Sequence, residues 1–335
     1  MFVLSIDIVG GGVAGLALAA QLDPGRWRVR LIDDATDRRE VGTCFGIWPF
    51  ALPALERLGL ADRVRARGVR PRSGSIWNSA GRTLLHSERV PEVHLITRLQ
   101  LLDWLDATVP STVRRIPERI DDPELLGADV VVGADGVHSA TRRRVFGCDA
   151  RPTGIVALRG LVEGVVEPGE YWGRGALFGS TPHPDGLVNW FATLPEFRAE
   201  PAQALVRARA AYRGFPEPVR RVLDAATAER TLVNRVLEAP ALRSFVSGRT
   251  VLIGDAAHAM SPNLGRGACE SLVDAAVLAE SLDRHPPAEA LARYDRARCR
   301  PTQRIRRAAA LVRRISLGGG PLRDPVLTGL GRFVR

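Results

Sequence analysis

The chain contains no lysine, because all 47 of its basic residues are arginine; against 37 acidic residues they give a net charge of +10 over 335 residues. A positive charge of this size raises the possibility of nucleic-acid binding. However, the arginines are spread along the chain and are dense only at residues 142–144 and in the C-terminal segment. Dispersed charge does not form a continuous binding stripe, so we expect no nucleic-acid partner.

Long hydrophobic runs are also missing, since no apolar stretch reaches the roughly 18–20 residues that a membrane span requires. The N-terminus leads directly into an apolar strand and a glycine loop, unlike a signal peptide. We therefore expect a cytoplasmic protein without a membrane partner.

Cysteine is scarce. Cys44, Cys148, Cys269 and Cys299 have neither zinc-ligand nor CxxC spacing, so we expect four reduced thiols and no metal site. The apolar share of 45% is sufficient for a large core, and the length suggests two domains or one domain with an insertion.

A nucleotide-binding pattern opens the chain. An expected strand over 2–9 is followed by Gly10-Gly11-Gly12-Val13-Ala14-Gly15, a helix over 16–22 and a strand over 29–32 that ends at Asp33. In this GxGxxG spacing Gly10 permits the tight turn, Gly12 lets a pyrophosphate approach the backbone, and Gly15 lets helix and strand pack closely. Val13 and Ala14 complete the predicted contact loop, and Asp33 suits an adenosine ribose hydroxyl.

A second pattern lies at residues 250–276. The apolar strand 251–253 breaks at Gly254-Asp255, and a loop with Pro262 leads to Gly265 and Gly267, which open a helix reaching residue 282. Free N–H groups at such a helix start favour an anion or a polarised carbonyl. Asp255 is suited to accept a hydrogen bond from a sugar-alcohol hydroxyl. On its own, this strand-turn-helix could equally be a packing corner.

A third strand, 129–132, ends in Gly133-Ala134-Asp135-Gly136. Together the three motifs resemble those of the class A (single-component) flavoprotein aromatic hydroxylases, of the para-hydroxybenzoate hydroxylase type. The resemblance covers most of the chain. It implies an α/β fold, in which a Rossmann-like FAD-binding domain carries an inserted antiparallel β-sheet substrate domain and C-terminal helices.

The resemblance also assigns cofactor contacts. It implies that Gly254, Asp255, Pro262, Gly265, Arg266 and Gly267 hold the ribityl chain and ring of FAD. Arg98 would reach the pyrophosphate and ribose side, and Asp135 would serve both FAD and a transient NAD(P)H. Only one complete GxGxxG unit exists, so we expect no separate NAD(P)H domain.

The implied domain limits are 1–72, 94–150 and 243–285 for the FAD-binding domain, 73–93 and 151–242 for the substrate-binding domain, and 286–335 for a C-terminal helical segment that packs across the domains. In the substrate domain we expect strands at 73–78, 82–86, 155–162, 175–178 and 187–192, and helices at 202–213 and 218–226. Residues 94–105 are expected to be helical, and 117–127 a compact link without an accessory hairpin.

The segment 40–60 resembles a family segment that runs from a glycine-rich turn into a helix, but it departs from that pattern at Thr43-Cys44, Phe50 and Pro53. Cys44 is expected to be a small buried residue rather than a reactive thiol. The aromatic residues of the inserted sheet form either its core or a pocket wall. Our candidate pocket residues are Trp48, Phe50, Trp172, Phe178 and Trp190, together with Arg159, which would meet an anionic substrate or form a structural ion pair.

The resemblance implies an FAD-dependent, NAD(P)H-consuming monooxygenase. Such an enzyme hydroxylates or epoxidises a small, electron-rich aromatic substrate with dioxygen, by way of a flavin hydroperoxide. FAD should be bound non-covalently, the chain should be a monomer or homodimer, and no catalytic acid or base is identified. Alternatives are Baeyer–Villiger oxidation or redox-neutral cyclisation on the same fold, an NAD-dependent dehydrogenase that uses only the first motif, and a non-catalytic nucleotide-binding protein.

Overall fold

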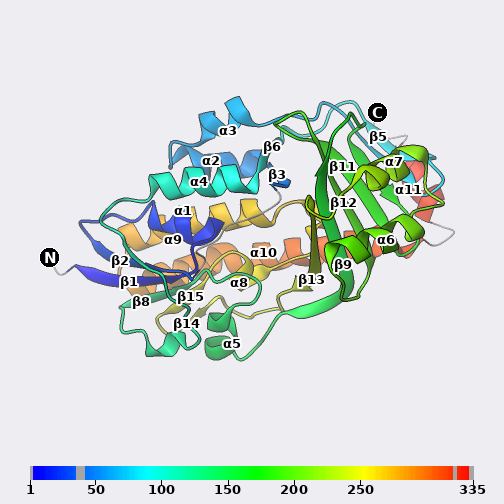
Figure 1. Ribbon diagram of the computed structural model, residues 1–335. Coiled ribbons are helices and arrows are strands. Elements are labelled where there is room, and N and C mark those ends of the chain that lie inside the picture. The colour runs from blue at the N-terminus through cyan, green and yellow to red at the C-terminus, as the bar shows by residue number, and fades with distance from the viewer. Residues whose placement is uncertain (1–2, 35–41, 320–322, 332–335) are drawn as a thin grey trace.

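A computed structural model describes residues 3–34, 42–319 and 323–331, which form two large sheets and a layer of helices (Figure 1). The first sheet has the order β14 (Val246–Ser247), β15 (Thr250–Leu252), β8 (Val130–Gly133), β1 (Leu4–Val9), β2 (Trp27–Ile32) and β7 (Arg114–Ile116). All neighbouring pairs are parallel except β14 with β15.

The three sequence motifs meet at one edge of this sheet. Parallel strands present their carboxyl ends on the same side, which is where nucleotides bind in such folds. Gly10 follows β1, Asp135 follows the end of β8, and Gly254 follows β15, and these three strands are neighbours. The topology therefore explains how motifs more than a hundred residues apart come together.

Four helices form a layer against the first sheet: α1 (Val13–Ala19), α4 (Arg98–Thr108), α9 (Gly267–Arg284) and α10 (Pro287–Gly318). α1 packs against α4 and α9, and α9 packs against α10 (Figure 1). The first core lies between this layer and the sheet, where Ile6, Leu16 and Leu272 are fully buried.

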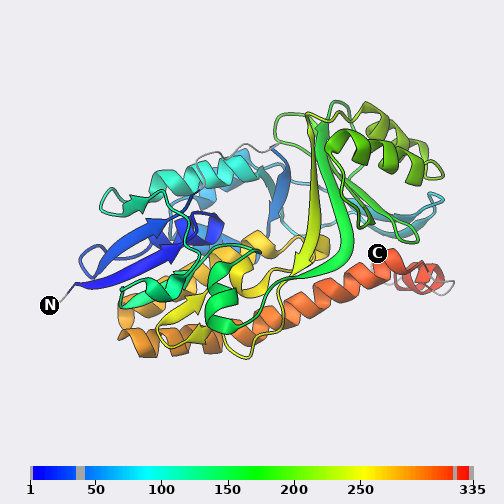
Figure 2. The same cartoon turned by 60° about the horizontal axis from the view of Figure 1, so that its bottom comes forward.

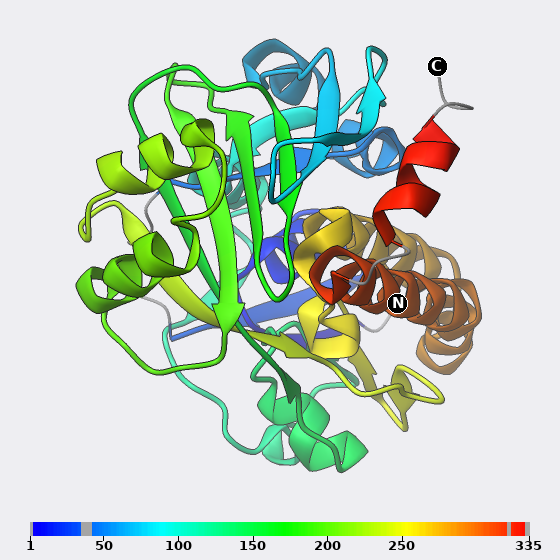
Figure 3. The same cartoon turned by 90° about the vertical axis from the view of Figure 1, so that its right-hand side faces the viewer.

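The second sheet has the order β13 (Thr231–Glu238), β9 (Arg151–Val162), β12 (Val188–Pro195), β11 (Leu177–Pro182), β10 (Gly169–Trp172), β4 (Gly74–Asn78) and β5 (Thr83–Ser87). Its pairs are antiparallel except β10 with β4. Figure 3 shows α6 (Pro201–Ala211) and α7 (Glu217–Ala225) on one side of this sheet and α10 on the other. Alternation along the strands produces a second core under α6 and α7.

One expectation was wrong. Residues 94–97, expected to be helical, form strand β6 (His94–Thr97), which pairs with β3 (Cys44–Ile47), and α4 begins only at Arg98. The reason is a capping box, in which the Thr97 side chain accepts from the Gln100 N–H and the Gln100 side chain accepts from the Thr97 N–H. This box fixes the helix start, so the preceding residues are available for the sheet.

The residues after β3 accommodate the proline that interrupts the family pattern. A 3-10 helix (Pro49–Ala51) leads into α2 (Leu52–Glu56), so Pro53 occupies the first turn of α2, where its missing N–H costs no hydrogen bond. α3 (Ala61–Arg67) follows. Between β7 and β8 the described residues form a short 3-10 helix (Pro123–Leu125) instead of a hairpin, as expected.

The long helix α10 connects the two sheets. Figure 2 shows it running from the layer beside the first sheet to the second sheet, where α11 (Arg323–Gly331) follows it. There the Gly175 N–H donates to the Leu317 oxygen at 2.8 Å, and Arg323 donates to the Trp172 oxygen at 3.1 Å. Among the described residues, no helix is both long enough and apolar enough to cross a bilayer.

Candidate functional site

The glycine loop after β1 shows why small residues are needed there. Gly10 has φ +110°, and a Cβ on it would lie 2.3 Å from the Ala134 oxygen. A Cβ on Gly15 would lie 1.9 Å from the Gly10 oxygen, so α1 packs directly against the end of β1. Both observations confirm the steric reasons predicted for these two glycines.

The start of α1 offers uncapped N–H groups. Gly12 is the N-cap residue and provides no side-chain cap, and a Cβ built on it would have no atom within 4 Å. The first N–H groups of the helix, including those of Val13 and Ala14, therefore adjoin open space at a positive helix end. This arrangement fits a pyrophosphate, and the contact itself stays a prediction.

Asp33 lies beside the same loop. Its Oδ2 accepts a hydrogen bond from the Gly11 N–H at 2.5 Å. The carboxylate thus fixes the loop, and its ribose contact stays a prediction.

The turn after β15 leaves one carboxylate accessible. Gly254 has φ +61° and precedes α8 (Asp255–His258). Asp255 is exposed although residues 251–254 and 256–259 are all buried. Within the described ranges no group donates a hydrogen bond to the Asp255 carboxylate, although its Oδ1 comes within 3.8 Å of a Cβ built on Gly267. An accessible acceptor beside a helix start fits the hydroxyl-binding role predicted for Asp255.

The loop before α9 is held by two aromatic residues. Gly265 has φ +59°, and its oxygen accepts from Trp48 Nε1 at 3.1 Å. The Arg266 guanidinium lies 4.0 Å from the ring centroid of Phe50, a cation–π contact. α9 then starts at Gly267 without a side-chain cap. The structure therefore brings Trp48 and Phe50 to the segment predicted to hold the flavin ring, close to Pro262.

Next to this segment lies a buried charge cluster of His258, Glu270, Asp274 and Arg298. Asp274 Oδ2 accepts from the Gly254 N–H at 2.8 Å and pairs with His258 Nε2 at 2.6 Å. Arg298 donates to Asp274 Oδ1 and to Glu270 Oε2, both at 2.6 Å. Glu270 Oε1 also accepts from Arg266.

Charge pairing sets the ionisation of this cluster. Burial raises the pKa of Asp274, but His258 and Arg298 lower it more, to about 2. Burial lowers the pKa of His258, and the neighbouring Asp274 carboxylate reverses this, so the pKa is raised overall. The cluster is therefore a set of paired charges rather than a set of neutralised groups.

The second sheet presents a row of residues on the face opposite its core. The strand register aligns Arg159 with Phe191, Phe191 with Gly179, Gly179 with Glu170 and Glu170 with Ile76. We call these five residues the inner row. Their neighbours along each strand, such as Tyr171 and Trp190, point to α6 and α7.

Two members of the inner row are recessed charges. Arg159 keeps accessible surface, yet protein surrounds it closely enough that burial lowers its pKa, as does nearby Arg98, while Asp255 raises it. Glu170 is half-buried; burial raises its pKa, and the opposing hydrogen bond from Trp172 Nε1 is 2.6 Å long. Both side chains therefore keep accessible surface although protein surrounds them closely enough to shift their pKa values.

Phe178 and Trp190 must be removed from the candidate pocket. Phe178 is 1% exposed, Trp190 is fully buried, and their rings stack at 6.4 Å within the core under α6 and α7. Because side chains alternate along a strand, these residues point away from Arg159. Trp172 lies on the same face as Glu170 and stays a candidate.

Comparisons with known proteins agree with this geometry. A family model described as "FAD binding domain" matches residues 220–309, which include the Gly254 turn and the buried charge cluster. The chain is 31% identical to an aurachin C monooxygenase/isomerase of Stigmatella aurantiaca, over 88% of this chain and 85% of that protein. It is 32% identical to a 3-amino-4-hydroxybenzoate 2-monooxygenase of Streptomyces cremeus, over 95% and 89%.

The chain belongs to the class A FAD-dependent aromatic hydroxylase family. Its fold matches the structure of Klebsiella pneumoniae HpxO complexed with FAD and uric acid, with a TM-score of 0.86 at 20% identity, covering 98% of this chain and 93% of that one. The α/β fold class inferred from the sequence is confirmed. This flavoprotein is accordingly an FAD-dependent monooxygenase with NAD(P)H as its electron donor.

Two predicted cofactor residues of this flavoprotein are engaged with the protein. Asp135 accepts hydrogen bonds from Ser139 Oγ at 2.5 Å and from the Thr141 N–H at 2.9 Å, so it fixes the start of α5 (Ala140–Phe146). Arg98 is exposed as the first residue of α4, and its N–H donates to the Thr43 oxygen at 3.2 Å. Their contacts with FAD or NAD(P)H stay predictions.

Burial favours the protonated form of two of the four thiols. Burial, and then Asp185, raises the pKa of Cys44 to about 12, and burial raises the pKa of Cys269 to a similar value of about 12. Cys44 is half-buried rather than buried as expected, and a thiol with such a pKa is almost wholly protonated at neutral pH. The described part of the chain contains no cluster of three or more side chains suited to a metal ion.

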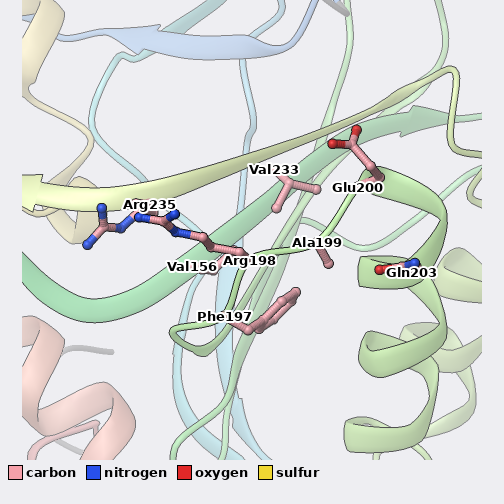
Figure 4. Close-up of a pocket in the computed structure, with 8 residues that line it drawn as sticks. All are labelled: Val156, Phe197, Arg198, Ala199, Glu200, Gln203, Val233 and Arg235. Atoms are coloured by element: carbon pink, nitrogen blue, oxygen red, sulfur yellow. The ribbon is translucent and has the colours of Figure 1, made fainter.

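A recess of about 450 Å³ elsewhere does not belong to this site. It is lined by Val156 and Val233 together with Phe197, Arg198 and Arg235 (Figure 4). Val156 is part of the second core, so this recess opens on the α6 side of the sheet and faces away from the inner row.

Sequence reasoning did not select Glu170 or Arg298, and it named Phe191 only among the aromatic residues that form either the sheet's core or a pocket wall. Glu170 and Trp172 are two residues apart, which places them on one face of a strand, but the sequence does not show which face is covered. Arg298 is one of 47 arginines, and its partners lie 24 and 28 residues away. We find no local signal that would have distinguished it.

Proposed function

We propose that this flavoprotein hydroxylates a small, planar, electron-rich aromatic compound that lies between the flavin and the inner row. The observation that carries the proposal is the row itself, with Phe191 between Arg159 and Glu170 on the sheet face opposite the second core. Asp255 influences the pKa of Arg159, so the row begins beside the predicted flavin site.

The middle of the inner row is a platform for a ring. A Cβ built on Gly179 would lie only 2.1 Å from Phe191 Cζ, so the Phe191 ring covers the space where a side chain would stand. The ring remains half-buried and therefore retains accessible surface. An aromatic substrate gains from stacking or edge contact with such a ring.

Two polar residues of the row flank the Phe191 platform. Arg159 and Glu170 are three strand steps apart, or ~14 Å between backbones at the usual strand spacing. We propose that one substituted ring lies between these two side chains. Burial raises the pKa of Glu170, and its carboxyl oxygens can accept hydrogen bonds. We therefore propose that a hydroxyl or ring N–H of the substrate contacts Glu170.

The chain's own residues bind, orient and shield, while the cofactor performs the chemistry. Bound FAD, reduced by NAD(P)H, supplies the activation of dioxygen and the transfer of one oxygen atom to the ring. We propose that Trp48, bonded to the Gly265 oxygen, and Trp172, bonded to Glu170, limit the access of water, which would favour loss of the oxygen as hydrogen peroxide. We propose that NAD(P)H approaches transiently beside Asp135 and has no domain of its own.

The names of relatives support a ring substrate with polar substituents. One relative acts on 3-amino-4-hydroxybenzoate, and a second, from Klebsiella oxytoca, is a urate hydroxylase. Another relative is named a monooxygenase/isomerase, so oxygen transfer followed by rearrangement is the second candidate function. The identity of the product distinguishes the two.

The proposal extends to the domain limits, the cellular location and the oligomeric state of the chain. We propose that residues 1–72, 94–150 and 243–285 form the FAD-binding domain, 73–93 and 151–242 the substrate-binding domain, and 286–335 a C-terminal helical segment. We also propose a cytoplasmic location, because the four cysteines are free and a reducing compartment preserves them. The chain would act as a monomer or homodimer.

The experiment measures NAD(P)H oxidation by the holoenzyme in the presence of salicylate, urate, 3-amino-4-hydroxybenzoate and a 4-quinolone. We expect at least one of these compounds to accelerate oxidation and to yield a hydroxylated product. For that compound, Glu170→Gln should raise KM about fivefold, the effect of one weakened hydrogen bond, with unchanged FAD content. No acceleration by any planar ring compound would contradict the proposal.

A further inference from the structure

Arg298 lies outside the nucleotide motifs, but its side chain pairs with two carboxylates that adjoin them. It belongs to α10, its side chain is 10% exposed, and it donates to Asp274 through Nε and to Glu270 through a terminal nitrogen. Both carboxylates are on α9 and are at most 2% exposed. One planar guanidinium therefore compensates two buried negative charges.

The first arm of this arrangement reaches the Gly254 turn. Asp274 uses one oxygen for Arg298 and the other for the Gly254 N–H and His258. Gly254 has φ +61° and directly precedes the accessible Asp255. The position of Asp255 thus depends on a carboxylate that Arg298 keeps ionised and oriented.

The second arm reaches the loop before α9. Glu270 accepts from Arg298 with Oε2 at 2.6 Å and from Arg266 with Oε1 at 2.8 Å. Arg266 in turn lies over Phe50. Without Arg298, the only cationic partner of Glu270 among the described residues would be the partly exposed Arg266. The Glu270 carboxylate would then be held through one oxygen instead of two.

α10 supports the same region at two further points. Tyr294 donates its hydroxyl to the Leu252 oxygen at 2.9 Å, at the end of β15. Asn263, in the loop before Gly265, donates to Ser316 Oγ at 3.3 Å. The helix therefore contacts the strand, the turn and the loop that precede the predicted flavin contacts.

We propose that Arg298 is a positioning residue for FAD, which acts through Asp274 and Glu270 to fix the Gly254–Asp255 turn and Arg266. Arg298 does not touch the cofactor in this account. The proposal requires only that FAD binds to this face, and it is independent of the substrate.

The test compares three variants with wild-type holoenzyme. Arg298→Lys keeps the charge but cannot bridge both carboxylates. Glu270→Gln removes the charge of one arm only. Arg293→Met is the matched control, because Arg293 is on the same helix in an exposed pair with Glu289. The FAD dissociation constant is obtained from the fluorescence of flavin released on dilution, at a temperature well below unfolding, and Tm is measured in parallel.

We expect the FAD Kd to rise about tenfold in Arg298→Lys and about threefold in Glu270→Gln, and to stay unchanged in Arg293→Met. A purely structural Arg298 would lower Tm while leaving the Kd of the folded protein unchanged, and that result would overturn the proposal. If Arg298→Lys fails to fold, Glu270→Gln decides: a wild-type Kd in that variant also overturns it.

Discussion

Two sets of charged side chains adjoin the Gly254 turn and differ in how they are satisfied. In the buried charge cluster, the carboxylates of Asp274 and Glu270 each accept hydrogen bonds from at least two partners. On the accessible side, neither Asp255 nor Arg159 has a hydrogen-bonded side-chain partner within the described residues, although Asp255 raises the pKa of Arg159. Buried charges must be paired to be tolerated, whereas accessible charges in a recess remain available for a ligand.

The difference predicts which property each residue controls. Residues of the buried cluster should determine the stability of the folded chain and, because they fix the Gly254–Asp255 turn and Arg266, also the affinity for FAD. Accessible residues should affect ligand binding with little effect on folding.

The largest effect is expected from Asp274→Ala. The substitution leaves Arg298 and His258 buried with less negative charge to compensate them, which costs about 3–5 kcal/mol of unfolding free energy. Denaturant unfolding of the holoenzyme measures the change. Asp62→Ala is the control, because Asp62 pairs with Arg65 on the surface with its side chain 97% exposed; its effect should be close to zero. Equal losses in the two variants would remove the distinction between buried and exposed charges.

Asp255→Ala should affect FAD binding rather than stability. Losing a charge-assisted hydrogen bond to a cofactor hydroxyl costs ~1.5–3 kcal/mol, or roughly ten- to a hundredfold in Kd. Flavin fluorescence on dilution gives the Kd, and Asp224→Ala on α7 is a surface control on the far side of the second sheet. A folded Asp255→Ala protein with wild-type affinity would show that this carboxylate does not face the cofactor.

Acid should weaken the buried cluster within a defined range. The pKa of Asp274 is lowered from 3.8 to about 2, so its ionised form stabilises the folded chain above pH 3.8, and this contribution disappears as pH falls towards 2. The linked loss is about 2 kcal/mol. His258 has the opposite sign: because its pKa is raised from 6.5, it contributes stability that is present below pH 6.5 and is lost as the pH rises through the raised pKa. Between pH 5 and 2, the unfolding free energy should fall less steeply with pH in Asp274→Ala than in the wild type. An unchanged slope would mean that other carboxylates cause the loss of stability in acid.

The local sterics of the motifs explain what the sequence could predict. The glycine loop and the Gly254 turn rely on spacing within a few residues, so Gly10 and Gly15 could be assigned correctly. Strand β6 was missed because its pairing with β3 is non-local. Phe178 and Trp190 were misassigned because aromatic residues occur on both faces of the second sheet, and only the strand register shows that Phe191 belongs to the inner row.

The smallest effect is expected from Gly179→Ala. The new methyl group would lie 2.1 Å from the Phe191 ring, so the ring must leave the position in which it would contact the substrate. We expect KM for the aromatic substrate to rise about threefold with no change in FAD affinity, since contact with one ring is weakened. Gly214→Ala is the control, because no atom lies within 4 Å of its Cβ position. Unchanged KM in Gly179→Ala would place the substrate away from Phe191.

The most direct test of the central claim follows the oxygen atom. Holoenzyme, NAD(P)H and an accelerating aromatic compound are incubated under isotopically labelled dioxygen, and the product is analysed by mass spectrometry. A monooxygenase that binds its substrate at the inner row should place one labelled oxygen atom on the ring for each NAD(P)H oxidised. If NAD(P)H oxidation yields only hydrogen peroxide and unlabelled aromatic compound with every substrate that binds, this account of the chain's function is contradicted.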